Sequence, residues 1–178
     1  MGTPRKITAL LVLACSAALA LTACTSGPAT PFTKVAAAPL GANEIVAGLV
    51  AAVPTAGLGV VYTAASDTNK LLGRPGGYTS KATFTDSRAK DPQTTDPGSV
   101  DLGGSVEIFP DSVGAVRRGQ YIQSIEASAG FLAHEYDVTA GSVLLRLASG
   151  LTPDQAESYR ASLAQVVGTD AQPVPAKS

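Results

Sequence analysis

Residues 131–168 read FLAHEYDVTAGSVLLRLASGLTPDQAESYRASLAQVVG, and this stretch decides the fold class. Its first half predicts two short strands joined by a tight turn at Ala140 and Gly141. Its second half predicts a helix, because Thr152 and Gln155 have the spacing of a capping box and apolar residues then recur at helical period. A hairpin followed directly by an amphipathic helix is typical of an antiparallel sheet that packs against helices.

The segments before this stretch predict further elements of both kinds. Asn43 can cap a helix that Pro54 stops, and the apolar residues between them form one stripe. Three more strands are expected at 58–63, 78–85 and 105–109. A helix expected at 111–129 would bury a stripe made of Ala115, Tyr121, Ile122, Ile125 and Ala129. This order predicts an α+β fold, an antiparallel sheet of about five strands with two or three helices packed on one face.

The chain has 178 residues, which indicates one folded domain with a core of its own. The predicted limits of that domain are residues 43–168. Residues 24–42 are rich in Pro, Ala, Gly and Thr and predict a flexible tether that begins at a lipidated cysteine. Residues 169–178 predict a polar tail.

Residues 1–23 have the three parts of a secretory signal peptide. A basic start precedes an apolar run at 7–21, and small residues follow it. The apolar run is shorter than the roughly 20 residues that a helix needs to cross the hydrocarbon core of a membrane. We therefore expect this segment to direct export and then to be removed.

The end of the signal peptide reads Leu21-Thr22-Ala23-Cys24, which resembles the lipobox of bacterial lipoproteins. The resemblance covers only the first 24 residues. It implies that the sulfur of Cys24 receives a diacylglycerol and that cleavage leaves Cys24 as the new N-terminus. Two or more acyl chains anchor a protein stably, so a place on the extracytoplasmic face of the cell membrane is expected. The alternative is an ordinary signal peptide that is cut elsewhere and leaves Cys24 as a free thiol.

Composition argues against several classes of function. The formal net charge of −1 disfavours binding to nucleic acid. Cys15 lies in the discarded apolar run and Cys24 would carry the lipid, so neither a disulfide nor thiol chemistry is expected in the domain. His134 is the sole histidine, and the usual ligand sets for zinc, copper and iron are therefore missing. We expect no metal and no cofactor.

The segment from His134 to Asp137 places this histidine beside two carboxylates, a combination used in general acid–base catalysis. Strand geometry separates them, because Glu135 and Asp137 point to the face opposite that of His134. A two-residue turn at 140–141 would pair Glu135 with Arg146 as a cross-strand ion pair. We interpret His134 as a core residue on an apolar face, and catalysis is the alternative.

A glycine-rich loop, GRPGGY at 73–78, leads into the second predicted strand. Phosphate-binding loops lead into a helix instead, so nucleotide binding is not expected. The loop is interpreted as a tight turn that positions Tyr78. The alternative is a recognition loop in which Arg74 and Tyr78 contact a partner.

Arg118 falls within the apolar stripe of the helix expected at 111–129. A charge in that place needs a partner to offset its loss of hydration. We expect a structural pairing with a carboxylate such as Glu107 or Asp137, and the alternative is a contact with a ligand.

Two other polar patterns favour no site. Asp91, Asp96 and Asp101 recur every five residues but do not match the alternating ligands of a calcium loop, so solvated acids are expected. Ser128 lacks the leading glycine of a nucleophile elbow and lies in a predicted helix, which argues against a serine hydrolase.

No catalytic set emerges from these patterns, and an enzyme is not expected. The leading interpretation is a membrane-anchored extracytoplasmic lipoprotein that acts as a binding module, with another envelope protein as its partner. The first alternative is a carrier of a small apolar ligand between the sheet and the helices, suggested by 45% hydrophobic but only 5% aromatic residues. The second alternative is a hydrolase that uses His134 and the nearby carboxylates.

Overall fold

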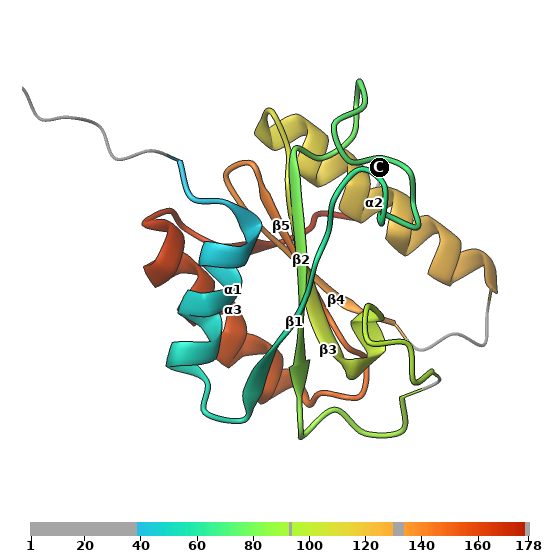
Figure 1. Ribbon diagram of the computed structural model, residues 1–178. Coiled ribbons are helices and arrows are strands. Elements are labelled where there is room, and N and C mark those ends of the chain that lie inside the picture. The colour runs from blue at the N-terminus through green and yellow to red at the C-terminus, as the bar shows by residue number, and fades with distance from the viewer. Residues whose placement is uncertain (1–38, 93, 130–133, 177–178) are drawn as a thin grey trace, which may run out of the picture. The chain divides into compact units, whose positions relative to one another are not determined.

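A six-stranded antiparallel sheet forms the centre of the computed structural model, which describes residues 39–92, 94–129 and 134–176 (Figure 1). The strands are β1 Ala56–Val61, β2 Ser80–Asp86, β3 Gly103–Ile108, β4 Tyr136–Ala140, β5 Val143–Leu147 and β6 Gln172–Pro173. Their order across the sheet is β1-β2-β3-β5-β4-β6, and each neighbouring pair is antiparallel. The edges of the sheet are therefore β1 and β6.

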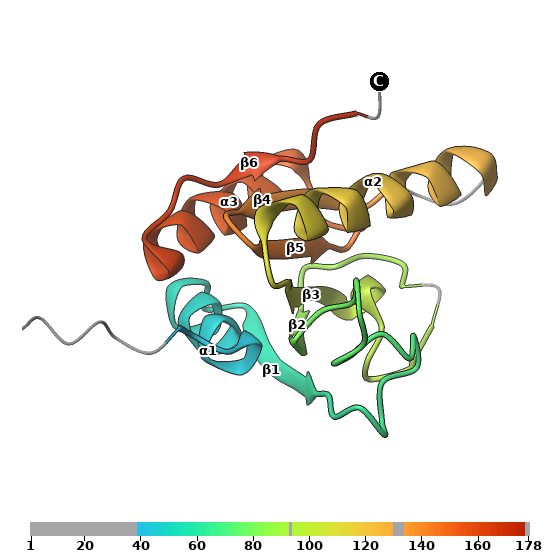
Figure 2. The same ribbon diagram turned by 90° about the horizontal axis from the view of Figure 1, so that it is seen from above.

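Two helices cover one face of this sheet and one helix lies across the other, as Figures 1 and 2 show. The helices are α1 Ala42–Ala52, α2 Ser112–Ala129 and α3 Pro153–Val167. Alternation along β5 separates the two layers. Leu145 belongs to the core beneath α1 and α3, whereas Leu144 packs with Ala115 of α2. The two faces of the sheet therefore pack against different layers, α1 and α3 on one and α2 on the other.

The predicted α+β class is confirmed, with one sheet and two helices on one of its faces. The described residues form six strands where about five were expected. The additional strand, β6, lies in residues 169–178, where a polar tail was predicted. Its neighbours Ala171 and Val174 are buried, and the Val174 N–H donates to the Asp137 carbonyl at 2.9 Å.

The helix α3 begins as its sequence predicts. Thr152 Oγ1 accepts from the Gln155 N–H at 3.3 Å, and Gln155 Oε1 accepts from the Thr152 N–H at 2.8 Å, so the capping box is complete. Gly168 ends the helix in the left-handed conformation, with φ 69°. Both ends are set by local chemistry, which explains why the prediction is correct.

The helix α1 is present where it was predicted, but it begins two residues earlier than the expected cap at Asn43 implies. Gly41 is the N-cap residue and makes no side-chain capping bond, so the expected cap at Asn43 is wrong. The first helical N–H, that of Ala42, donates to Ser80 Oγ on β2 at 3.0 Å. A tertiary contact therefore satisfies a donor that a local cap was expected to satisfy.

The core between α1, α3 and the sheet contains a buried polar anchor. Tyr159 of α3 lies against Phe84 of β2, with ring centroids 5.1 Å apart, and its hydroxyl donates to Asp86 Oδ2 at 2.6 Å. Burial disfavours the charge on Asp86, but hydrogen bonds from Arg88 and Tyr159 lower its pKa to about 2. This contact fixes α3 to the end of β2.

The β4–β5 hairpin is present with a different register. Ala140 pairs with Val143, so the turn lies at Gly141 and Ser142 rather than at Ala140 and Gly141. Gly141 takes φ 59°, which favours glycine at the first turn position. The shift moves each partner by two residues and leaves the faces unchanged, so Asp137 rather than Glu135 lies directly opposite Arg146.

Candidate functional site

The sheet face beneath α2 carries polar side chains where the other face carries apolar ones. One row across four strands consists of Thr83, Ser105, Arg146 and Asp137. In the next row Lys81 of β2 lies opposite Glu107 of β3. These residues are buried or nearly so. Charged side chains among them, such as Glu107, are therefore expected to find partners within the protein.

Glu107 lies at the centre of this polar face and is fully buried. Its Oε2 accepts from Arg118 Nε of α2 at 3.2 Å, and its Oε1 lies 3.6 Å from Arg146 Nη1 of β5. The expected pairing of Arg118 with Glu107 is confirmed. One carboxylate thus faces two guanidinium groups that approach from different layers.

Arg146 has a second carboxylate partner in Glu135, the residue just before β4. Its Nε and Nη2 each donate to Glu135 at 2.8 Å, in a bidentate pair. The predicted ion pair between these residues is confirmed, although it is diagonal across the strands. Burial raises the pKa of Glu135 against the opposing effect of Arg146. The pair holds the Arg146 guanidinium in one orientation.

Asp67 organises the loop between β1 and β2. Its Oδ1 accepts from the Tyr78 hydroxyl at 2.7 Å, and its Oδ2 accepts from the N–H groups of Leu71 and Leu72 at 2.8 and 3.1 Å. Lys81 lies 3.5 Å away. Burial opposes the charge, but these hydrogen bonds and Lys81 lower the pKa of Asp67 to about 2. The loop is therefore tied to the sheet by a buried carboxylate.

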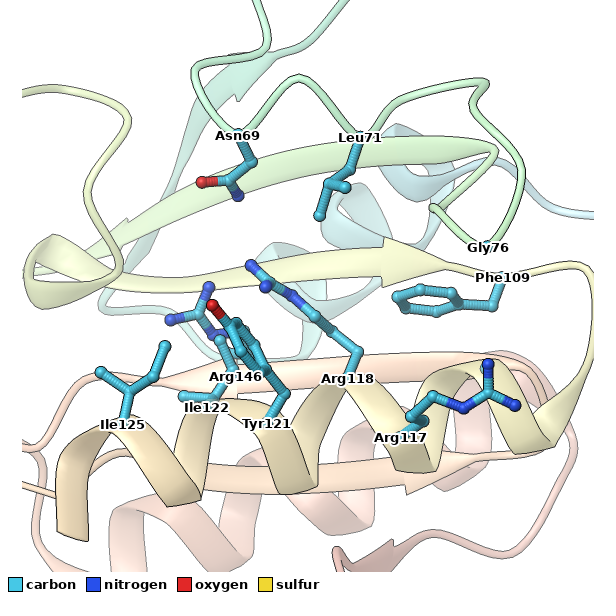
Figure 3. Close-up of a pocket in the computed structure, with 11 residues that line it drawn as sticks. Asn69, Leu71, Gly76, Phe109, Arg117, Arg118, Tyr121, Ile122, Ile125 and Arg146 are labelled. Carbon is cyan, nitrogen blue, oxygen red and sulfur yellow. The ribbon is translucent and has the colours of Figure 1, made fainter. Parts of the chain in front are cut away.

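Asn69 connects this loop to the arginine cluster. The oxygen and nitrogen of its amide group exchange places relative to Figure 3. The oxygen then lies 3.3 Å from Arg118 Nη2 and 3.2 Å from Lys81 Nζ. In that orientation an acceptor faces two cations. Loop, sheet and α2 are joined in one network of charges.

A pocket of about 660 Å³ lies above this network, between α2, the loop and the sheet. Figure 3 shows Arg118, Tyr121 and Arg146 together in its middle, below the loop that carries Asn69 and Leu71. Apolar atoms of Leu71, Phe109, Ile122 and Ile125 complete the walls. The site therefore combines apolar walls with a cationic floor.

The apolar residues of α2 differ from the predicted stripe. Ala115 and Ile122 are buried as expected, but Tyr121 and Ile125 are 55% and 44% exposed. Glu126 takes a buried place on this helix instead. The expectation that Tyr121 and Ile125 join the core is wrong, because these side chains line the pocket.

The glycine-rich loop does not present its two candidate residues together. Tyr78 is fully buried against Phe109, with the rings edge to face at 5.9 Å. Arg74 is exposed and does not line the pocket. Tyr78 therefore offers no exposed surface beside Arg74 in this structure, and the loop acts as the turn that positions Tyr78.

His134 is not a core residue. Its side chain is 72% exposed and its Nδ1 lies 3.6 Å from Glu126 Oε2. The strand begins only at Tyr136, after residues that lie outside the described part of the chain, so His134 takes no place on the predicted apolar face. Exposure of this kind gives no buried environment for acid–base catalysis.

Asp137, which the sequence offered beside His134 and as a possible partner of Arg118, is buried and pairs with neither of them. Neither of its carboxylate oxygens has a hydrogen-bond partner among the described residues. Burial, together with the negative charge of Glu135, raises the pKa of Asp137 to about 7. It lines a second pocket, of about 310 Å³, beside α3 and β6. The charge of the Asp137 side chain therefore depends on pH near neutrality.

The remaining candidates form no site. Across the described ranges, no group of three or more His, Cys, Asp and Glu side chains could hold a metal ion, and Asp91, Asp96 and Asp101 do not gather. Ser128 lies in α2, and its hydroxyl donates to the Ser124 carbonyl at 2.7 Å. Its helical place does not fit the sharp turn of a nucleophile elbow.

Comparison with protein-family models, with curated proteins and with solved structures gave no match. No helix in the described part of the chain is long and apolar enough to cross a membrane. The predicted signal peptide, the lipobox-like segment with Cys24 and most of the predicted tether lie outside the described residues.

Proposed function

We propose that this protein is a lipid-anchored extracytoplasmic binding protein that holds a small ligand in the pocket beneath α2. The observation that carries the proposal is the pocket of about 660 Å³, with apolar walls and a floor of buried, paired charges. Its volume is within the range of roughly 300–1,000 Å³ of small-molecule sites. The lipobox-like Leu21–Cys24 segment supports the anchor.

Contacts within the protein hold the cationic floor of the pocket and the loop above it in place. Arg118 is held by Glu107, Arg146 is held by Glu135, and the loop is held by Asp67. Binding to such a site costs little ordering of side chains, so more of the contact energy contributes to affinity. The fixed side chains therefore support the proposal that the pocket is a binding site rather than a surface irregularity.

A second candidate function is attachment of an envelope protein along the edge of the sheet. Leu58 and Val61 of the edge strand β1 are 69% and 61% exposed. An extended segment of a partner could add to this edge and cover both side chains. This proposal needs no small ligand, which separates it from the first.

Native mass spectrometry of the chain from Thr25 to Ser178, purified gently after export, distinguishes the two. This segment contains every described residue, and the described body has its own core. The first proposal expects a bound mass that denaturation removes. It also expects that mass to be lost in Ile125→Trp, which fills the pocket, and kept in Val113→Trp, at an exposed position of α2 outside this pocket. A bare polypeptide mass from every variant would contradict the first proposal and favour the edge of β1.

A further inference from the structure

The chemistry of the lining narrows the ligand class, and this step rests on the proposed function. We infer that the pocket takes a small organic anion with an apolar body, whose carboxylate or phosphate group is bound by Arg118 and Arg146. The inference follows from the charge of the lining, the donors left on the two guanidinium groups and the apolar walls beside them.

The charged side chains that line the pocket have one sign. Arg117, Arg118 and Arg146 are among the lining residues, and no Asp or Glu is. The acidic partners lie behind the arginines, with Glu107 fully buried on β3. A ligand in the pocket therefore meets guanidinium groups first, and water screens the little-exposed Arg118 and Arg146 less than the exposed Arg117.

The two central arginines are positioned but not saturated. A guanidinium group has five N–H donors. The hydrogen bonds of Arg118 to Glu107 and to Asn69 use Nε and Nη2, and those of Arg146 to Glu135 use Nε and Nη2. Arg146 Nη1 lies 3.6 Å from Glu107, which is too long for a hydrogen bond. Donors remain on both groups for the oxygens of a carboxylate or phosphate.

Both arginines are also largely shielded from water, with side chains 12% exposed. Their carboxylate partners prevent the groups from moving out toward solvent. The Tyr121 ring lies 5.7 Å from the Arg118 guanidinium carbon and supports it from the side. Fixed cationic donors of this kind recognise a planar or tetrahedral anion better than a flexible lysine does.

The walls require an apolar part of the ligand as well. Ile125 and Tyr121 expose apolar surface to the pocket, and Leu71 and Phe109 face it from the loop and the end of β3. Covering these side chains would contribute hydrophobic free energy that an inorganic anion cannot supply. The fitting ligand is thus amphipathic, with its charge toward Arg118 and Arg146.

The test is a titration of the Thr25–Ser178 chain with a matched series of ligands, in which isothermal titration calorimetry measures each affinity. The series is octanoate, octyl phosphate, octan-1-ol, octylammonium and inorganic phosphate. We expect the two organic anions to bind at least about tenfold more tightly than the alcohol, the cation or inorganic phosphate. Equal affinity for octan-1-ol would overturn the inference and leave an apolar ligand for the proposed function.

Variants locate the effect without removing a buried charge. Ile125 is exposed at the pocket, so Ile125→Glu and Ile125→Lys change the local charge while the fold tolerates both. The glutamate should weaken octyl phosphate at least about fivefold relative to the lysine. Arg74→Gln, at an exposed position outside the lining, should change nothing. Arg118→Lys keeps a positive charge but loses the fork of donors, and weaker anion binding is expected there too.

Failure of this inference differs from failure of the proposed function. A bound mass in the native spectrum, with no preference for anions in the titration, overturns the anion inference alone. No bound mass and no binding of any member overturns both. Sedimentation with phosphatidylglycerol vesicles, without binding of the soluble anions, would assign the anion chemistry to a membrane headgroup and also overturn the inference.

Discussion

Arg118 Nε lies 3.2 Å from Glu107 Oε2, and this contact joins α2 to the centre of the sheet. Arg118 belongs to α2 and Glu107 to β3, so the contact crosses the interface between the helix and the sheet. Their pairing keeps a cation at the pocket floor and offsets part of the cost of burying it. Stability and the proposed ligand recognition would therefore depend on the same contact.

Glu107→Gln should destabilise the fold. It removes the fully buried charge that Arg118 and Arg146 share, and leaves two cations with a neutral neighbour. Breaking a buried pair in this way costs about 3–5 kcal/mol of unfolding free energy. Urea denaturation followed by circular dichroism measures the loss. Glu157→Gln, which removes an exposed partner of Arg160, is the control, and equal midpoints for the two variants would contradict the account.

Asp137 should make stability fall as pH rises through neutrality. Its pKa is raised from 3.8 to about 7 by burial, so the folded protein keeps a proton that the unfolded chain releases near pH 4. The stabilisation is complete below about pH 4 and is lost as pH rises through about 7, by roughly 1.4 kcal/mol per pH unit at most.

Asp137→Asn should flatten this dependence, because the amide cannot ionise. Thermal unfolding between pH 5 and 8 is the measurement. Glu135, whose pKa is also raised, gives a residual slope of the same sign. A variant that loses stability with pH as steeply as the wild type would show that Asp137 is charged in the folded state.

Thr152→Ala should weaken the start of α3. It removes the oxygen that accepts from the Gln155 N–H and costs about 1 kcal/mol. Denaturant unfolding measures the effect. Thr68→Ala, at an exposed loop position outside any helix, is the matched control, and an equal loss there would contradict a capping role for Thr152.

Cys24→Ser should abolish lipid attachment. In cells fed a labelled fatty acid, the wild type is expected to incorporate the label and to sediment with membranes. Cys15→Ser, inside the predicted leader, should behave as the wild type does. A wild-type protein without label would contradict the anchor, whatever its distribution between fractions.

Features set by neighbouring residues were predictable from the sequence. The capping box of α3 and the hairpin depend on contacts within a few positions, and both are present, the hairpin with its turn one residue later than predicted. Arg118 was expected to find a partner such as Glu107, because a cation inside an apolar stripe has few alternatives. Burial energetics predict a carboxylate partner for Arg118, and the structure shows that it is Glu107 rather than Asp137.

Features that depend on distant segments were not predictable. Tyr121 and Ile125 have the spacing of core residues, yet a loop from before β2 leaves a pocket over them. His134 was placed in a strand that in fact begins two residues later. The two residues of β6 include a proline and show no periodicity, so only their pairing with β4 reveals the strand. The pocket itself is built by three elements that no local pattern connects.

The most direct measurement is the ¹H–¹⁵N spectrum of the Thr25–Ser178 chain, with arginine Nε signals resolved, during addition of octyl phosphate. Binding of the anion by the two arginines predicts saturable shifts of Arg118 Nε and Arg146 Nε, together with backbone shifts in α2 and in the loop that carries Asn69. Shifts confined to β1, or unchanged signals from both arginines at saturation, would contradict a binding pocket beneath α2.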